Sequence, residues 1–355
     1  MVKEDYFVMV DHKALEAFLI QAYEKAGLPH DDAAVLSESL VRANLRGFDS
    51  HGVLLAPMYF KRMQMGGIDV ETETQVISDT GCTAVIAGGN GVGQVVSYRA
   101  MQLAIEKAGQ YGVGVVGARN SNHFGATGYW AMMALEHDMI GMAMTNTSPL
   151  MAPWGGTTPV LGSSPLAVAI PAGKEYPVVL DMATTMVAGG KLRIKAMREE
   201  KIPMGWAVGP DNEPTDDPNE ALKGHILPLG GVCAYKGYGL ALMVDILSAV
   251  LMGASFGTAP ALDAKVRDLG HYFQAIKVSN FMSLEEFKPR VDTLLQQLLA
   301  SELEPGMERV YYAGLREYLA EEERRSQGLP LDGPVYGNLE KMSEELGVPF
   351  NIRLS

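Results

Sequence analysis

The sequence predicts an α/β fold, in which helices pack on a sheet, and three observations support this prediction. Short runs of β-forming residues alternate with helical windows through the middle of the chain, as expected for helices packed against a sheet. Both ends of the chain show the apolar spacing of amphipathic helices. The chain has 355 residues, of which 47% are hydrophobic, enough for about two or three packed units with sizeable cores.

The N-terminal part is predicted to form three helices. Residues 12–26 carry apolar side chains at helical spacing and are followed by a Gly-Leu-Pro stop. Asp31 is expected to cap a second helix that runs to about residue 45. A third helical stretch covers residues 53–65 and ends at two glycines.

The middle of the chain supplies the predicted sheet. The predicted strands are residues 83–87, 113–116, 140–145, 166–170 and 178–180, with helical windows at 95–108 and 128–136. Residues 146–162 and 205–231 are rich in Gly, Pro and Asp and are expected to be long loops, which often carry function.

Helices dominate the last part of the chain. They are predicted at residues 240–252, 283–300 and 307–326, and the charged run 321–325 is expected to be a solvated face. We expect residues 1–75 and 283–355 to pack together as a helical substrate and dimerisation part. Residues 76–282 are then the central α/β part that binds the cofactor.

Composition excludes several classes of function. The net charge of -13 and the lack of a long basic run disfavour nucleic-acid binding. Two distant cysteines, Cys82 and Cys233, favour a reducing compartment. The N-terminus lacks the layout of a signal peptide, and the apolar residues 240–254 contain Asp245 and are shorter than the ~20 residues of a membrane span. We therefore expect a cytoplasmic protein that binds neither membranes nor nucleic acid.

Two histidine segments are candidates for acid–base chemistry. His51 follows an acid and a hydroxyl at a break between two predicted helices, which suits a general acid near neutral pH. The alternative there is a helix N-cap beside a surface histidine. His123 lies between a predicted strand and a helix, a common site geometry in α/β folds. The alternative there is a capped turn with a hydrogen-bonded histidine.

Other segments are weaker candidates. Residues 145–165 are rich in Gly, Pro and hydroxyl groups and could wrap a polar cofactor. Lys236 stands at a predicted helix start, where an anion is favoured. Residues 88–93 lack the G-x-G-x-x-G spacing, which argues against a Rossmann fold. No close ligand pair has zinc spacing, so no metal is expected. His12, His30 and His225 lie in polar contexts and are expected to be exposed.

Five segments in order resemble the type-2 malate/L-lactate dehydrogenase family. Residues 46–52 resemble its L-R-G-x-D-S-H-G signature, 120–125 resemble N-S-x-H-F-G, and 179–186 resemble V-x-D-M-A-T-S; the segments 235–240 and 304–306 complete the set. The similarity spans roughly residues 10–325. The family also includes sulfolactate and ureidoglycolate dehydrogenases, 2,3-diketogulonate reductase and piperideine/pyrroline-2-carboxylate reductases.

The resemblance implies a non-Rossmann, mixed β-sheet flanked by helices, like sulfolactate dehydrogenase. It also implies NAD or NADP as cofactor and a homodimer whose active site lies partly at the subunit contact. His51 and His123 match the two histidines to which proton transfer is assigned, and Ser50 would assist at the substrate. Arg46 and Asn122 are the expected substrate-binding residues. The implied cofactor-binding residues are Thr147, Asp181, Met182, Ala183, Lys236, Pro305, Gly306 and Met307.

The sequence departs from the family pattern at two places. Leu55 stands where S-H-G-x-x-R-L-P places an arginine, and Ser163-Ser164 replace the Thr-Asn of G-T-N-P. A cation should hold the substrate carboxylate, preferably arginine with its bidentate fork. Either the substrate presents a less charged group there, or one of three nearby cations substitutes: Arg46, Lys61 or Arg62.

The expected reaction is the NAD(P)-dependent interconversion of a 2-hydroxy acid and a 2-keto acid, with histidine as proton donor and acceptor. The alternatives are a cyclic imine reductase, suggested by Leu55, and a cofactor-binding homologue without activity. A metal-dependent hydrolase is a more remote alternative. NADP would need a basic residue at its 2'-phosphate, and the available residues are Arg119, Lys191, Arg193 and Lys195.

Overall fold

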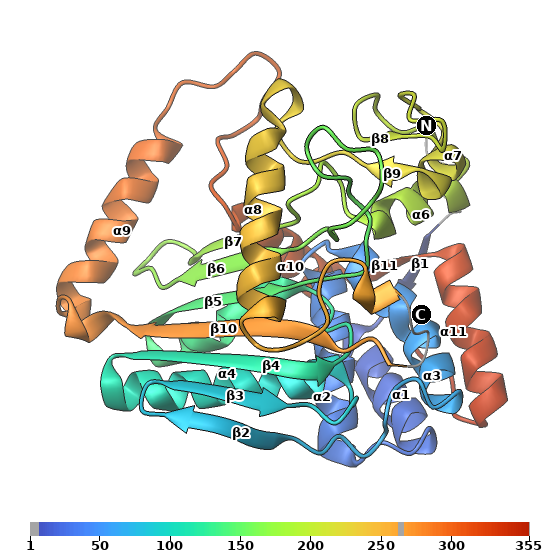
Figure 1. Ribbon diagram of the computed structural model, residues 1–355, viewed down its shortest axis with the longest axis horizontal. Coiled ribbons are helices and arrows are strands. Elements are labelled where there is room, and N and C mark those ends of the chain that lie inside the picture. Colours follow the sequence, from blue (N-terminus) through green and yellow to red (C-terminus); the bar gives the residue numbers. More distant parts are fainter. Residues whose placement is uncertain (1–6, 262–265, 355) are drawn as a thin grey trace.

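The computed structural model describes residues 7–261 and 266–354, and a seven-stranded sheet forms its centre (Figure 1). The strands are β2 (Gln75–Thr80), β3 (Thr83–Ala87), β4 (Val113–Ser121), β5 (Met139–Thr145), β6 (Leu166–Ile170), β7 (Val178–Met182) and β10 (Leu269–Lys277). Their order is β2-β3-β4-β10-β5-β6-β7. In this sheet, β3 and β4 are parallel and the other neighbouring pairs are antiparallel. The mixed sheet confirms the α/β, non-Rossmann prediction.

The middle strand, β10, has no counterpart among the predicted strands. Phe273 of β10 lies opposite Val116 of β4 on one side and Ala143 of β5 on the other. Phe273 and Ala275 are fully buried. Because both partners of β10 come much earlier in the chain, its position depends wholly on long-range pairing.

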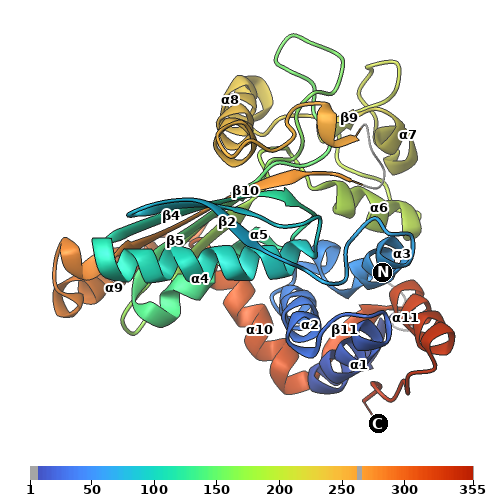
Figure 2. The same ribbon diagram turned by 60° about the horizontal axis from the view of Figure 1, so that its bottom comes forward.

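Helices cover both faces of the sheet (Figure 2). α4 (Gly93–Tyr111) and α5 (Thr127–Met132) lie on one face; α8 (Tyr235–Asp245), which continues as a π-helix over Ile246–Val250, lies on the other. α4 supplies the crossover that the parallel pair β3–β4 requires. It packs very closely, because a Cβ at Gly114 of β4 would lie 2.0 Å from the carbonyl oxygen of Ala104.

The two ends of the chain pack together, as predicted. The elements involved are β1 (Phe7–Val10), α1 (His12–Lys25), α2 (His30–Leu45), α3 (Ala56–Gln64), α10 (Leu315–Gln327), β11 (Leu329–Asp332) and α11 (Gly333–Leu346). β1 pairs antiparallel with β11. Leu15, Leu36, Tyr59 and Leu339 belong to one buried core that both ends share.

Helix α9 (Leu284–Leu299) lies apart from that shared core. Its Asp292 accepts backbone hydrogen bonds from Gly173 at 2.9 Å and Lys174 at 2.8 Å, in the turn between β6 and β7. Leu295 packs with Tyr312 in a separate small cluster. α9 therefore packs on the turn between β6 and β7, and the division of the chain at residue 283 stays a prediction.

Three local predictions are wrong. Residues 205–231 are not one loop, since they contain β8 (Ala207–Val208), α7 (Pro218–Lys223) and β9 (His225–Ile226), which lie beside α6 (Gly189–Met197). α10 begins at Leu315, after Gly314 with φ of 94°. Asp31 lies in the first turn of α2, and Pro29 is the N-cap residue of that helix.

Across residues 7–261 and 266–354, no helix combines the length and apolar character needed to cross a membrane.

Candidate active site

A cavity of about 350 Å³ lies between α3, α6, α7 and the segment after β5. This volume is typical of a small-molecule site. It brings together both candidate histidines and several of their predicted neighbours: Ser50, His51, Asn122, His123 and Thr147. Segments distant in the sequence therefore meet at one site.

The cavity wall is cationic. Three arginines line it, Arg62, Arg193 and Arg267, and no Asp or Glu is among its described lining residues. Arg193 lies on α6, and Arg267 lies two residues before the start of β10. Guanidinium groups are well matched to carboxylates, so the cavity suits a small anion.

Asn44 shapes the turn that carries His51. Asp49–His51 form a single 3₁₀ turn between α2 and α3. Asn44 Nδ2 donates to Asp49 Oδ1 at 2.7 Å, and Asn44 Oδ1 accepts from the backbone N–H of Val53 at 2.7 Å. A Cβ at Gly52 would lie 2.0 Å from Asn44 Oδ1, so this turn requires glycine there.

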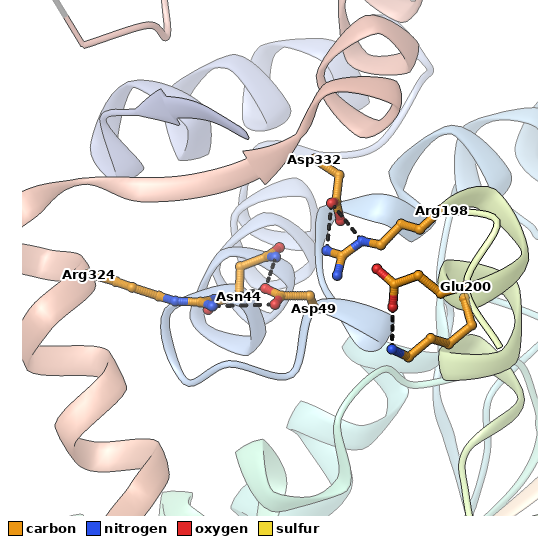
Figure 3. Close-up of polar contacts among 7 residues, drawn as sticks. Asn44, Asp49, Arg198, Glu200, Arg324 and Asp332 are labelled. Carbon is orange, nitrogen blue, oxygen red and sulfur yellow. Dashed lines mark hydrogen bonds and ion pairs between the residues drawn. The ribbon is translucent and has the colours of Figure 1, made fainter. Parts of the chain in front are cut away.

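Helix α10, from the last part of the chain, braces the same turn (Figure 3). Arg324 Nη1 donates to Asp49 Oδ1 at 2.8 Å and also reaches the backbone carbonyl of Asn44. Arg198, just after α6, pairs with Asp332 at 2.6 Å on the neighbouring side (Figure 3). The run 321–325 is therefore not merely a solvated face, because its Arg324 pairs with the side-chain carboxylate of Asp49 beside the candidate site.

We expect Arg324→Met to lower kcat about tenfold and stability by about 1 kcal/mol, because Asp49 loses a partly exposed ionic partner. Steady-state kinetics and urea unfolding measure the two effects. Arg316→Met is the matched control, since Arg316 is exposed on the same helix. Equal effects of the two substitutions would contradict the bracing role.

The two histidines face each other across the cavity. Their rings are nearly parallel, with centroids 5.9 Å apart and an interplanar angle of 18°. Ser50 Oγ lies 3.0 Å from Nδ1 of His51, and the hydroxyl of Tyr59 lies 2.6 Å from Nδ1 of His123. Each imidazole is thus held through Nδ1 by a hydroxyl group.

Asn122 orients Arg62. Its Nδ2 donates to the carbonyls of Asn90 and Gly91, both at 2.9 Å, and its Oδ1 accepts from Arg62 Nη2 at 3.0 Å. Arg62 Nη2 also donates to the carbonyl of Gly67 at 2.8 Å. Asn122 lines the cavity, but its amide is engaged by these partners, so it acts there by directing the guanidinium.

Arg62 shares with Leu55 the face of α3 that lines the cavity. Leu55, Met58, Tyr59 and Arg62 all line the cavity, at the spacing of one helix face. Lys61 is exposed and is not among the lining residues. Of the three cations considered as substitutes for the family arginine, Arg62 is thus the one that reaches the cavity, two turns after Leu55.

Both histidines are held neutral. Burial lowers the pKa of His51 to about 4, and Lys191 adds to the effect. Burial also lowers the pKa of His123 to about 3, with further contributions from His51 and Arg267. Burial and nearby cations both disfavour the imidazolium form. At neutral pH both side chains are therefore neutral imidazoles.

Small residues and hydroxyl groups form another part of the wall. Thr147 Oγ1 accepts from the backbone N–H of Ser163 at 3.0 Å, and Thr184 Oγ1 donates to the Ser163 carbonyl at 2.9 Å. Gly189 and Gly190 line the cavity where α6 begins. Free N–H groups at a helix start favour an anionic group, so this wall fits a phosphate-bearing cofactor.

Arg46 lies outside the described cavity wall, so its expected role in substrate binding stays a prediction. Its Nη1 donates to Glu321 Oε2 at 3.2 Å, and its guanidinium lies 4.3 Å from the centre of the Tyr318 ring. Asp181 accepts from the backbone N–H of Gly128 at 2.7 Å. Burial raises the pKa of Asp181 to about 6, and Gly128 and Arg46 oppose this rise.

The remaining predicted cofactor residues also lie outside the described cavity wall. Met182 and Ala183 are half-buried near the end of β7, and Lys236 is exposed at the start of α8. The residues Pro305, Gly306 and Met307 are exposed between α9 and α10. Their roles stay predictions.

Several cavity residues were not predicted. Tyr59 and Arg267 carry no motif of their own, and only folding brings them beside His123. His225 is 8% exposed and lines the cavity, although its polar context indicated an exposed side chain. His271 is buried under the site, with its nitrogens 2.7 Å from Thr145 Oγ1 and 2.8 Å from Ser121 Oγ.

The chain is similar to known dehydrogenases in sequence and in structure. Residues 10–340 match the family model described as malate/L-lactate dehydrogenase. The chain is 39% identical to malate dehydrogenase of Pyrococcus abyssi over 97% of both chains. It is 42% identical to L-sulfolactate dehydrogenase of Methanocaldococcus jannaschii, over 93% of this chain and 95% of that protein. The crystal structure of malate dehydrogenase from Entamoeba histolytica superposes with a TM-score of 0.95 at 32% identity, covering 97% of this chain and 99% of the other.

Proposed function

Because the chain belongs to the malate/L-lactate dehydrogenase family, we propose that this oxidoreductase interconverts a 2-hydroxy acid and a 2-keto acid with NAD or NADP. The observation that carries the proposal is the cavity in which His51 and His123 stack among three arginines. This combination provides groups that move a proton and cations that hold a carboxylate.

Arg62 is the proposed partner of the substrate carboxylate. Its guanidinium lines the cavity and is directed by Asn122 at 3.0 Å. A guanidinium can donate a charge-assisted hydrogen bond to a carboxylate. Because both Nη2 hydrogens of Arg62 are engaged by Gly67 and Asn122, Nη1 would be the donor to the substrate. Arg62 would thus take over the role of the family arginine that Leu55 replaces.

The histidines manage the proton. In oxidation, a neutral imidazole accepts the proton of the substrate hydroxyl. In reduction, an imidazolium donates it to the keto oxygen. A bound carboxylate favours the charged form of a nearby histidine, so an anionic substrate raises the lowered pKa values of His51 and His123 toward the working range.

The cofactor would be held by the hydroxyl and glycine wall of Thr147, Ser163, Gly189 and Gly190. When bound, the nicotinamide supplies or takes up the hydride. The other proposed cofactor contacts are Asp181, Met182, Ala183, Lys236, Pro305, Gly306 and Met307. The proposed cofactor is either NAD or NADP. The two free cysteines, Cys82 and Cys233, support a cytoplasmic location.

Consumption of NADH and NADPH across a panel of 2-keto acids tests the proposal. Turnover of a 2-keto acid is the expected result. Binding of reduced cofactor without turnover of any substrate would instead indicate a homologue without activity. Absence of cofactor binding would contradict the proposal.

Leu55 favours one alternative, reduction of a cyclic imine. It gives the cavity an apolar residue at the position where the family pattern has a cation. Piperideine-2-carboxylate and pyrroline-2-carboxylate therefore belong in the same panel. Faster turnover of these imines than of every keto acid would support the alternative.

We also propose a homodimer, supported by an apolar face on α8. Leu240, Met243, Ile246 and Val250 are 39%, 47%, 39% and 47% exposed at helical spacing. Met243→Glu is expected to yield monomers, measured by light scattering after size exclusion. Met65→Glu is the control, because Met65 is 64% exposed after α3. A dimer that survives Met243→Glu would contradict the assigned face.

A further inference from the structure

His123 has two donors at its Nδ1 atom. The hydroxyl oxygen of Tyr59 lies 2.6 Å from this nitrogen. The backbone N–H of Gly125 also donates to it, with a nitrogen-to-nitrogen distance of 3.4 Å. A backbone N–H can only donate. Nδ1 therefore accepts, and in a neutral imidazole the proton is on Nε2.

Tyr59 is suited to be the second donor. Its side chain is 1% exposed on α3, in the core shared by the two ends of the chain. Burial raises the pKa of its hydroxyl, with smaller opposing effects from Gln94 and Arg62. The hydroxyl thus keeps its proton at neutral pH and can donate it to His123.

His51 is not constrained in this way. Its Nδ1 lies 3.0 Å from Ser50 Oγ, and a serine hydroxyl can rotate to donate or to accept. Both neutral tautomers of His51 are compatible with this contact. His51 can therefore gain or lose a proton without breaking its hydrogen bond to Ser50.

We propose that Tyr59 is a positioning residue that holds His123 as the Nε2–H tautomer, so that His123 donates a hydrogen bond to the reacting oxygen while His51 exchanges the proton. The assignment rests on the proposed oxidoreductase function. In oxidation, the hydroxyl proton of the substrate passes to His51, and in reduction it returns to the keto oxygen. A neutral imidazole that polarises a carbonyl is a known catalytic device.

The direct test is ¹⁵N NMR of protein labelled at histidine, at about pH 7.5, where a neutral imidazole reports its tautomer. The His123→Asn variant identifies the His123 signals. We expect Nε2–H in the parent and a mixture of tautomers in Tyr59→Phe. We also expect the His123 titration to move to higher pH in Tyr59→Phe, because a donor to the neutral ring is lost. A protonated Nδ1 in the parent would overturn the proposal.

Kinetics provide the second readout. Tyr59→Phe is expected to lower kcat about tenfold with KM changed less than about twofold. Tyr23→Phe is the matched control, because Tyr23 is also buried and its hydroxyl contacts the Ala56 carbonyl at 3.4 Å. An unchanged tautomer and unchanged kcat in Tyr59→Phe would overturn the proposal. The NMR readout needs no substrate, so an inactive parent would count against the proposed function without deciding the tautomer.

Discussion

Alanine at His51 is expected to lower kcat by about 10²–10⁴-fold, the usual contribution of general acid–base catalysis. Alanine at His123 is expected to lower kcat by about 10²–10³-fold, the usual cost of losing one hydrogen-bond donor to the reacting oxygen. Both rings line the cavity and stack at 5.9 Å, so each substitution removes a group at the reacting centre. Both side chains are only half-buried, and we expect the fold to persist. Steady-state kinetics, with circular dichroism as the folding check, measure the outcome.

His30→Ala is the matched control, because His30 is exposed and pairs with Glu24 at 2.8 Å. Its kcat should equal that of the parent. The pH dependence adds a second check: kcat/KM for oxidation should fall only as the pH approaches about 4, where His51 gains its proton. Unchanged turnover in both alanine variants at the site would exclude the histidine mechanism.

Arg62→Met is expected to raise KM for the keto acid by about 10²-fold, because a charge-assisted hydrogen bond contributes about 1.5–3 kcal/mol and a tenfold change in affinity corresponds to about 1.4 kcal/mol. The methionine keeps much of the apolar stem that packs along α3. Lys61→Met is the control, since this neighbouring cation is exposed. The measurement is the dependence of the initial rate on keto-acid concentration.

Leu55→Arg provides a rescue test of carboxylate binding by Arg62. Leu55 and Arg62 line the same cavity from the same helix face, so an arginine at 55 can approach the same carboxylate. We expect Leu55→Arg to recover at least part of the lost affinity when it is combined with Arg62→Met. A KM that is unaffected by Arg62→Met would show that the carboxylate binds elsewhere, with Arg193 and Arg267 as the remaining cations of the wall.

Local patterns were sufficient for the elements whose stabilising contacts are close in sequence. The apolar spacing of residues 12–26 predicts α1 within one residue. The alternation from 83 to 180 predicts β3, β4, β5, β6 and β7, whereas β2 and β10 have no counterpart among the predicted strands. β10 escaped prediction because both of its neighbours precede it by long stretches of chain. The helix expected at 307–326 begins at Leu315, because Gly314 has a φ of 94°, which a right-handed helix cannot include.

The sequence by itself determined the α/β class, the pairing of the chain ends and the presence of His51 and His123 in family motifs. Only the tertiary structure decided that Arg62 lines the cavity while Arg46 is held by Glu321. It also placed Tyr59 at Nδ1 of His123. The physical reason is that periodicity and motifs record a residue's local preferences, whereas the role of a charge or a proton depends on partners brought near it through space.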